Sequence, residues 1–266
     1  MKFCAVIPAA GRGSRLGEDI PKILVPVVDN LTILDFLYEK LSPFVDRVHI
    51  VASPSGLPLV QEKIAARGSV EPPITVSVQQ EPRGMGDAIF GAYEDWKGAE
   101  NILIMWGDQL HVSEQTIAFS RKVHLESEPP TCTLPLVVKQ DLYVEYVLTA
   151  EGGLGAILQS REGDVCNPSG HSDVGTFLLT VDGLYGLWEE YLESSQSGAL
   201  TNEVNFLPFL VFLSDKGWHY NHIPVEDPDE NRGINTQEDL QFFRELYSSK
   251  SDLKYALKTS ADEEGN

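Results

Sequence analysis

The first segment whose residues could do chemistry is a glycine-rich stretch near the amino terminus. Residues 8–17 read PAAGRGSRLG, and Pro21 and Lys22 follow shortly afterwards. Glycines directly after a short apolar run let backbone N–H groups approach phosphate oxygens closely. Arg15 and Lys22 could neutralise the charge of a triphosphate. The glycine spacing fits neither the dinucleotide fingerprint nor a Walker loop, so the segment predicts a polyphosphate-binding loop of another kind.

Two further segments place polar residues where an α/β protein binds ligands. Residues 79–88 read QQEPRGMGDA, which indicates a strand end, a glycine turn and a helix start. Such a turn can seat a planar base, and a plain helix cap is the alternative. Asp108 follows the apolar run 101–106. At the carboxyl end of a buried strand it could hold Mg²⁺ against a phosphate, or simply cap the next helix.

These segments resemble the signatures of the sugar-phosphate nucleotidyltransferases. Residues 11–22 match the pattern G-x-G-[ST]-R-[LM]…P-K, with a spacing most similar to the uridylyltransferase branch that acts on N-acetylglucosamine 1-phosphate. The preceding IPAAG is similar to the cytidylyltransferase branch. The resemblance implies that Arg15 and Lys22 are catalytic and stabilise the leaving pyrophosphate. It also implies a nucleotide-binding loop formed by Ala9, Ala10, Gly11, Gly13 and Ser14.

The same resemblance implies the roles of the other motifs. Gln79, Gly84 and Met85 would read the nucleobase, with Met85 in place of the usual threonine. Asp108 would bind both the nucleotide and Mg²⁺. Asn235 lies in the segment GINT, which is similar to the family element that completes the magnesium site, so it would be the second metal ligand.

The acceptor-binding residues implied by the resemblance come from the second half of the chain. Asp173 stands in DVGT, similar to the family's N-T-G, and Glu203 and Asn205 stand in TNEVN. Gln159 replaces the family glutamate that holds sugar hydroxyls, and residues 143–146 replace the segment Y-G-R. These two departures argue against a standard hexosamine acceptor.

The rest of the sequence predicts the elements that position these residues. Strand and helix patterns alternate up to about residue 140, which is typical of a mostly parallel sheet with helices on both faces. The strands are expected at 3–7, 47–52, 74–78, 101–106 and 131–138, and the helices at 33–41, 57–66, 87–96 and 113–126. Beyond residue 140 we expect an antiparallel hairpin at 143–149 and 154–160, strands at 173–181 and 218–222, and helices at 184–192, 204–213 and 236–246.

We therefore expect one α/β nucleotidyltransferase domain over residues 1–258, and the resemblance implies that it is Rossmann-like. Its nucleotide-binding core would span about 1–140, its acceptor-binding part about 141–235, and its closing helix 236–258. Residues 259–266 are small, polar and acidic, which is typical of a frayed tail.

Composition excludes several other classes of protein. The net charge of -20, from 40 acidic and 20 basic residues, disfavours a broad nucleic-acid-binding surface. No uncharged apolar stretch reaches the roughly 18 residues that a membrane span needs. Cys4, Cys132 and Cys166 lack metal-ligand spacing and predict reduced thiols in a cytoplasmic protein. A homo-oligomer is compatible with the sequence.

The expected reaction joins a nucleoside triphosphate to a phosphorylated small molecule, with a sugar 1-phosphate as the expected acceptor and pyrophosphate as the product. A cytidylyltransferase acting on a non-sugar phosphate or phosphonate remains an alternative. A non-catalytic nucleotide-binding protein of the same fold is another, and a nicotinamide dehydrogenase is a weaker one.

Overall fold

The structure, a computed structural model, describes residues 2–11, 16, 20–194 and 197–248. A ten-stranded sheet runs through the molecule, and β2 (Pro26–Val28) and β3 (Leu31–Thr32) form a second, small sheet. The strands of the large sheet are β1 (Phe3–Ala9), β4 (Arg47–Ala52), β5 (Ile74–Val78), β6 (Asn101–Met105), β7 (Thr131–Gln140), β8 (Val144–Leu148), β9 (Leu154–Gln159), β10 (Ser169–Asp173), β11 (Thr176–Thr180) and β12 (His219–Val225). The helices are α1 (Ile33–Leu41), α2 (Leu57–Ala66), α3 (Met85–Gly91), α4 (Tyr93–Trp96), α5 (Glu114–Glu126), α6 (Leu184–Ser194), α7 (Leu207–Asp215) and α8 (Gln237–Ser248).

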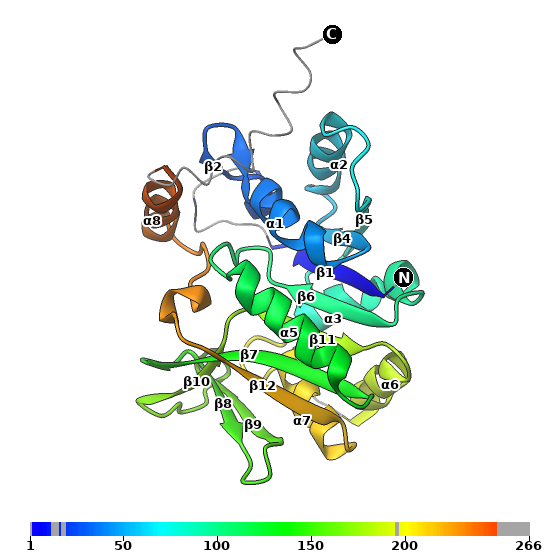
Figure 1. Cartoon of the computed structure of the whole chain (residues 1–266), viewed down its shortest axis with the longest axis vertical. Helices are drawn as coiled ribbons and strands as arrows, with labels where there is room; N and C mark the ends of the chain where they lie inside the picture. Colours follow the sequence, from blue (N-terminus) through cyan, green and yellow to red (C-terminus); the bar gives the residue numbers. More distant parts are fainter. Residues whose placement is uncertain (1, 12–15, 17–19, 195–196, 249–266) are drawn as a thin grey trace.

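The first part of the sheet is parallel, in the order β5-β4-β1-β6 (Figure 1). β1 and β6 are buried along nearly their whole length, as expected for parallel strands covered on both faces. Alternate side chains of β1 therefore enter two separate cores. Phe3, Ala5 and Ile7 pack with α1, α2, α5 and α8 on one face. Cys4 and Val6 pack with α3, α4, α6 and α7 on the other face.

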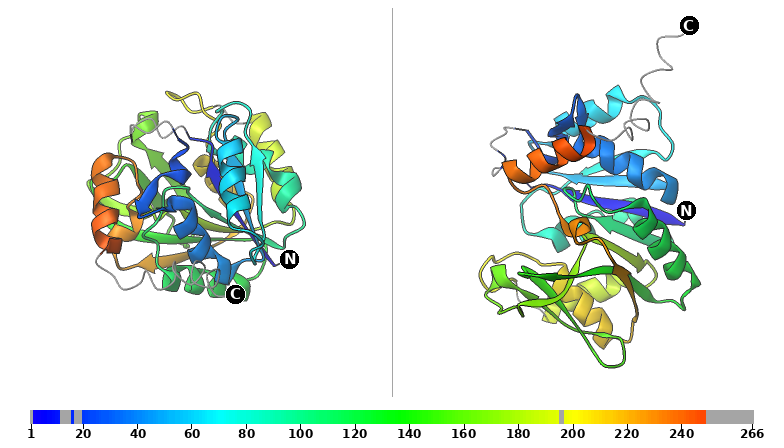
Figure 2. Two further views of the ribbon diagram at one scale, coloured as in Figure 1. Left: turned by 90° about the horizontal axis from the view of Figure 1, so that it is seen from above. Right: turned by 60° about the vertical axis from the view of Figure 1, so that its left-hand side comes forward.

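The second part of the sheet is antiparallel. β11 pairs with β6, and Thr176 lies opposite Met105. β7, β10, β8 and β9 follow in that order, while β12 runs parallel to β7. β8 and β9 form the predicted hairpin. Figure 2 shows this part together with α6 and α7 on one side of the molecule, and α1, α2 and α8 on the other. The predicted α/β class is confirmed, with a mostly parallel Rossmann-like core and an antiparallel extension.

Two predicted elements are interrupted in the structure. The single strand expected at 173–181 is wrong in this detail, because the chain leaves the sheet at Gly175, where φ is +72°, between β10 and β11. The helix expected at 87–96 is divided at Ala92 into α3 and α4. α3 also begins two residues earlier than expected, directly after Gly84, whose φ of +120° is a conformation that favours glycine.

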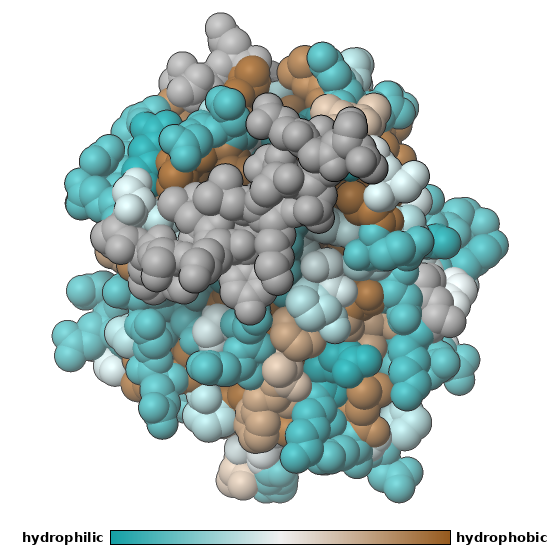
Figure 3. All heavy atoms as spheres, turned by 45° about the horizontal axis from the view of Figure 1, so that its top comes forward, coloured by the Kyte–Doolittle hydropathy of each residue, from teal (hydrophilic) through white to brown (hydrophobic). Residues whose placement is uncertain are grey.

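The described residues end within the predicted closing helix. α8 is described to Ser248, so residues 249–258 and the expected tail lie outside the described part of the chain. Cys4, Cys132 and Cys166 are free thiols. Within the described ranges, no helix has the length and apolar character needed to cross a membrane. On the face shown in Figure 3, hydrophilic side chains surround small separate apolar patches.

Asp35 connects two helices that cover the parallel part of the sheet. It accepts hydrogen bonds from the backbone N–H and hydroxyl of Thr32 at the start of α1, at 2.7 and 2.8 Å. It also forms ion pairs with Lys63 at 2.8 Å and with Arg67, which lie in and directly after α2. The Asp35 side chain is only 9% exposed, so these contacts are shielded from water.

We predict that Asp35→Ala lowers the free energy of unfolding by about 3 kcal/mol, because it leaves the partly buried Lys63 without its counter-charge, takes one of two carboxylate partners from Arg67 and removes the acceptor of the two Thr32 hydrogen bonds. Urea-induced unfolding measures this change. Glu39→Ala is the control, since it removes a more exposed partner of Arg67 and should cost less than about 1 kcal/mol. Equal effects of the two substitutions would contradict this account of Asp35.

Candidate functional site

A cavity of about 370 Å³ opens where the parallel and antiparallel parts of the sheet meet. Its wall includes Trp106 and Asp108, which follow β6, and Asp173, the last residue of β10. Another side is closed by Asn231, the last residue of η5 (Pro228–Asn231), and by Gly233 and Asn235 of the following segment. The cavity therefore lies at carboxyl ends of strands, where α/β sheets bind ligands.

Three of the predicted residues meet at one edge of this cavity. The ammonium of Lys22 lies 2.6 Å from Oδ2 of Asp108 and donates a hydrogen bond to Oδ1 of Asn235 at 3.0 Å. The Lys22 and Asp108 side chains are each 20% exposed, so the pair is half-buried but reachable from solvent. Lys22 thus contacts one residue that lies 86 positions away in the sequence and another that lies 213 positions away.

Local backbone contacts fix the positions of Asp108 and Asn235, the two residues that Lys22 contacts. The N–H of Ile234 donates to the carbonyl of Asp108 at 3.0 Å, which holds the two segments side by side. A Cβ on Gly233 would lie 3.2 Å from the Asp108 carboxyl group, so a larger residue would crowd it. Asp239 accepts from the N–H of Asn235 at 3.1 Å at the start of α8. Asp108 and Asn235 are therefore positioned by backbone packing as well as by Lys22.

The predicted phosphate loop begins beside Asp108. Ala9 ends β1, and a Cβ on Gly107 would lie 3.2 Å from the carbonyl of Pro8 and 3.5 Å from the Cβ of Ala9. Ala10 and Gly11 continue the chain from there. Gly13, Ser14 and Arg15 lie outside the described residues, so their predicted roles stay predictions.

The turn predicted to read a base packs against the segment before α7. The side-chain N–H₂ of Gln79 donates to the carbonyl of Gly84 at 2.9 Å and to Asp87 at 2.8 Å. A Cβ on Gly84 would lie 2.8 Å from the backbone of Val204. Gln79 therefore uses its donors to brace the turn, and its predicted contact with a nucleobase stays a prediction. Met85 lines the cavity.

Gln159, Asp173 and Asn205 line the cavity, and their role in binding an acceptor stays a prediction. Gln159 and Asp173 are buried, and burial raises the pKa of Asp173. Glu203 does not line the cavity but pairs at 2.6 Å with Arg161, which does. Arg161 was not predicted as a site residue, although a cation next to the end of the predicted hairpin was a usable signal.

Glu162 anchors the segment that carries Glu203 and Asn205. It accepts hydrogen bonds from the backbone N–H groups of Leu200 and Thr201 at 3.0 and 3.3 Å, and from the side chain of Asn205 at 2.9 Å. Burial alone would raise the pKa of Glu162, but these donors and the Thr201 hydroxyl outweigh it and lower the pKa to about 2. Asn205 in turn accepts from Arg161 at 2.7 Å, so Glu162 fixes this wall indirectly.

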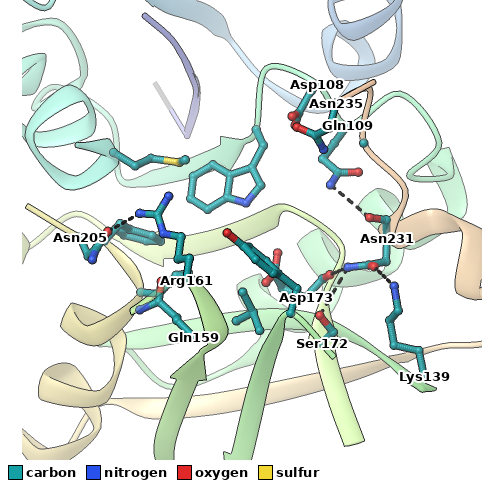
Figure 4. A pocket seen from close by; sticks show the side chains of 17 residues that line it. Asp108, Gln109, Lys139, Gln159, Arg161, Ser172, Asp173, Asn205, Asn231 and Asn235 are labelled. Atoms are coloured by element: carbon teal, nitrogen blue, oxygen red, sulfur yellow. Dashed lines mark hydrogen bonds between the residues drawn. The ribbon is translucent and has the colours of Figure 1, made fainter. Parts of the chain in front are cut away.

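Lys139, Asn231, Ser172 and Gln109 also line the cavity and were not predicted (Figure 4). Lys139, near the end of β7, donates to Oδ1 of Asn231 at 2.6 Å. Asn231 belongs to η5 and precedes the predicted ligand Asn235 by four residues. The motif around Asn235 was recognised, but nothing local to it indicated a partner on β7.

Comparisons with known proteins identify the family of this chain. The family model of the MobA-like NTP transferase domain matches residues 5–167. The bifunctional protein GlmU of Blochmanniella pennsylvanica is 21% identical over 263 residues, which cover 94% of this chain and 53% of GlmU. GlmU of Clostridium botulinum is 22% identical over 260 residues, covering 96% and 54%. The chain thus spans about half the length of these curated relatives.

Solved structures share the fold. HddC of Yersinia pseudotuberculosis has a TM-score of 0.67 and 20% identity, covering 93% of this chain and 100% of HddC. A protein of Bacillus anthracis described as a glucose-1-phosphate thymidylyltransferase has a TM-score of 0.71 and 15% identity, covering 94% and 96%. The 4-diphosphocytidyl-2C-methyl-D-erythritol synthase of Anaerococcus prevotii has a TM-score of 0.64 and 15% identity, covering 93% and 96%.

We predict that Glu162→Ala releases the segment before α7. The amides of Leu200 and Thr201 should exchange with solvent deuterium at least about tenfold faster, because their acceptor is lost. Glu151→Ala, at an exposed carboxylate of the β8–β9 turn, should leave this exchange unchanged. Because the folded pKa of Glu162 lies below its ordinary value of 4.5, the stabilisation is complete above about pH 4.5 and is lost as the pH falls towards 2. Unchanged exchange in Glu162→Ala would contradict this role.

Proposed function

Since the chain belongs to the MobA-like NTP transferase family and is a nucleotidyltransferase, we propose that it joins a nucleoside triphosphate to a phosphorylated small molecule, with a sugar 1-phosphate as the first candidate acceptor. An oxygen of the acceptor phosphate attacks the α-phosphorus, the bond to the β-phosphate oxygen breaks, and pyrophosphate leaves. The acceptor phosphate is already an anion, so the reaction needs no general base. Positioning and charge neutralisation supply the catalysis.

The observation that carries this proposal is the contact of Lys22 with Asp108 and Asn235 at the edge of the cavity. The phosphate-binding segment, the strand-end carboxylate and the helix-start amide were each predicted from a separate motif. One residue of each, Lys22, Asp108 and Asn235, meets the others at this contact. In the proposed reaction, the Lys22 ammonium stabilises the charge that develops on pyrophosphate. Arg15 would assist from the part of the loop that lies outside the described residues.

The same contact supports Mg²⁺ as the cofactor. The Lys22 ammonium is a stand-in cation between one carboxylate oxygen and one amide oxygen, a donor set that suits Mg²⁺ completed by phosphates and water. The described residues include no group of three or more His, Cys, Asp or Glu that could hold a metal ion without substrate. Bound there, Mg²⁺ would withdraw charge from the α-phosphate. Asp108 and Asn235 would hold it, and Lys22 would then face the phosphates.

A non-sugar acceptor is the second candidate, and two observations favour it. Gln159 lines the cavity as an amide rather than a carboxylate, so it has lost one means of holding sugar hydroxyls. The fold is also shared with a 4-diphosphocytidyl-2C-methyl-D-erythritol synthase. Both candidates use the same triphosphate side, and they differ only in what Gln159, Asp173 and the Arg161–Glu203 pair contact.

We predict that one combination of nucleoside triphosphate and acceptor releases pyrophosphate, and that Lys22→Ala lowers its turnover by about 100-fold or more. The assay measures pyrophosphate with the four triphosphates against sugar 1-phosphates, polyol phosphates and phosphonates. Lys122→Ala, on the exposed face of α5, is the control and should keep the wild-type rate. Near-normal turnover of Lys22→Ala would remove its assignment, and tight triphosphate binding without turnover on any acceptor would favour a non-catalytic protein.

We predict opposite effects of two isosteric substitutions on the metal requirement. Asn235→Asp adds a charged ligand and should tighten Mn²⁺ binding in the presence of a triphosphate about tenfold, or about 1.4 kcal/mol. Asp108→Asn should weaken it by at least as much. Electron paramagnetic resonance of Mn²⁺ measures binding independently of turnover. Unchanged affinity in both variants would exclude these residues as the metal site.

A further inference from the structure

Lys139 is a cation of the cavity whose charge is not balanced by a described neighbour. Of the cationic side chains in the described part of the chain, Lys139 and Arg161 line the cavity. Arg161 pairs with the carboxylate of Glu203 at 2.6 Å. Lys139 forms no ion pair among the described residues, and its hydrogen bond runs to the neutral amide oxygen of Asn231 at 2.6 Å. Arg161 therefore has a carboxylate partner, whereas Lys139 has only a neutral one.

The position of the Lys139 ammonium is fixed by its neighbour. The amide N–H₂ of Asn231 donates to the carbonyl of Asp173 and to the hydroxyl of Ser172, so its oxygen must face Lys139. The backbone carbonyl of Asn231 accepts from Gln109, which follows Asp108 directly. One N–H of the ammonium is used by Asn231, which leaves two donors. A half-buried ammonium kept without a counter-charge costs free energy unless an anion joins it.

Asp108 is occupied by Lys22 at 2.6 Å. Asp173 is buried, and its carboxyl group accepts a hydrogen bond from the backbone N–H of Gly175 at 2.7 Å rather than pairing with Lys139. Although the whole chain carries a net charge of -20, this wall is therefore suited to bind negative charge. Phosphate oxygens accept charge-assisted hydrogen bonds from an ammonium, and these are stronger than neutral ones.

We propose that Lys139 binds the phosphate group of the acceptor, an inference that rests on the proposed function. Figure 4 shows Asp108 and Asn235 at one end of this wall and Lys139 at the other, with Asn231 between them. Lys22 would face the leaving pyrophosphate, whereas Lys139 would hold the attacking phosphate on the opposite side of the α-phosphorus. In-line attack requires this separation of the two anions.

The experiment measures phosphate binding directly and needs no knowledge of the acceptor. The enzyme is saturated with Mg²⁺ and the best-binding α,β-methylene nucleoside triphosphate, which fills the triphosphate side, and is then titrated with methyl phosphate in a calorimeter. We expect Lys139→Met to weaken methyl phosphate binding by about 10-fold to 100-fold. Lys139→Arg should retain much of the affinity. The triphosphate analogue should bind wild type and both variants equally.

Lys122→Met is the matched control, because Lys122 is 66% exposed on α5 and is not among the residues that line the cavity. Equal methyl phosphate affinity of wild type and Lys139→Met, or no binding to wild type, would overturn the role of Lys139 while leaving the proposed function intact. A parallel loss of triphosphate affinity in Lys139→Met would also overturn it, since the lysine would then serve the nucleotide side. If no triphosphate analogue binds wild type, the proposed function fails and this inference fails with it.

Discussion

The candidate site depends above all on the contact of one ammonium with two oxygens. Lys22 follows the first strand, Asp108 follows β6, and Asn235 precedes α8, so their meeting joins the start, the middle and the end of the described chain. Two oxygens placed close together without a cation would repel each other, and Lys22 removes that repulsion. Under the proposed function, a metal ion and phosphates would meet the same electrostatic requirement when the substrates are bound.

The two sides of the cavity are mechanically linked. Gly86 donates its N–H to the carbonyl of Val204 at 3.0 Å, and Val204 donates to the carbonyl of Arg83, so the expected base-reading turn and the segment before α7 share backbone hydrogen bonds. A Cβ on Gly86 would lie 2.4 Å from the ring of Trp188, which leaves no room for a larger residue. Glu162 holds the same segment from its other side. A displacement of the turn at residues 84–86 would therefore also displace the segment before α7.

The sequence was most informative where chemistry and local structure coincide. Asp108 and Asn235 stand at a strand end and a helix start, so short motifs located them, and the boundaries of α1, α2, β4 and β5 followed from hydrophobic periodicity. The partners of Arg161 and Lys139 were not predictable, because they arise from contacts across 42 and 92 residues. Gln79 was predicted to read a base, and its use in bracing its own turn required the three-dimensional path of residues 79–87.

The place of β11 in the sheet has a consequence for how the chain acquires its structure. β11 lies between β6 and β7, although some seventy residues separate it from β6 in the sequence, and β12 then pairs with β7. As the chain leaves the ribosome, one edge of β6 stays unpaired until residue 180 has emerged. The pairing of β7 with β12 forms later still, because β12 ends at Val225. Unpaired edges of apolar strands invite association with other chains. The pairing of β6 with β11 is therefore a contact of high sequence separation, the kind that forms slowly during folding.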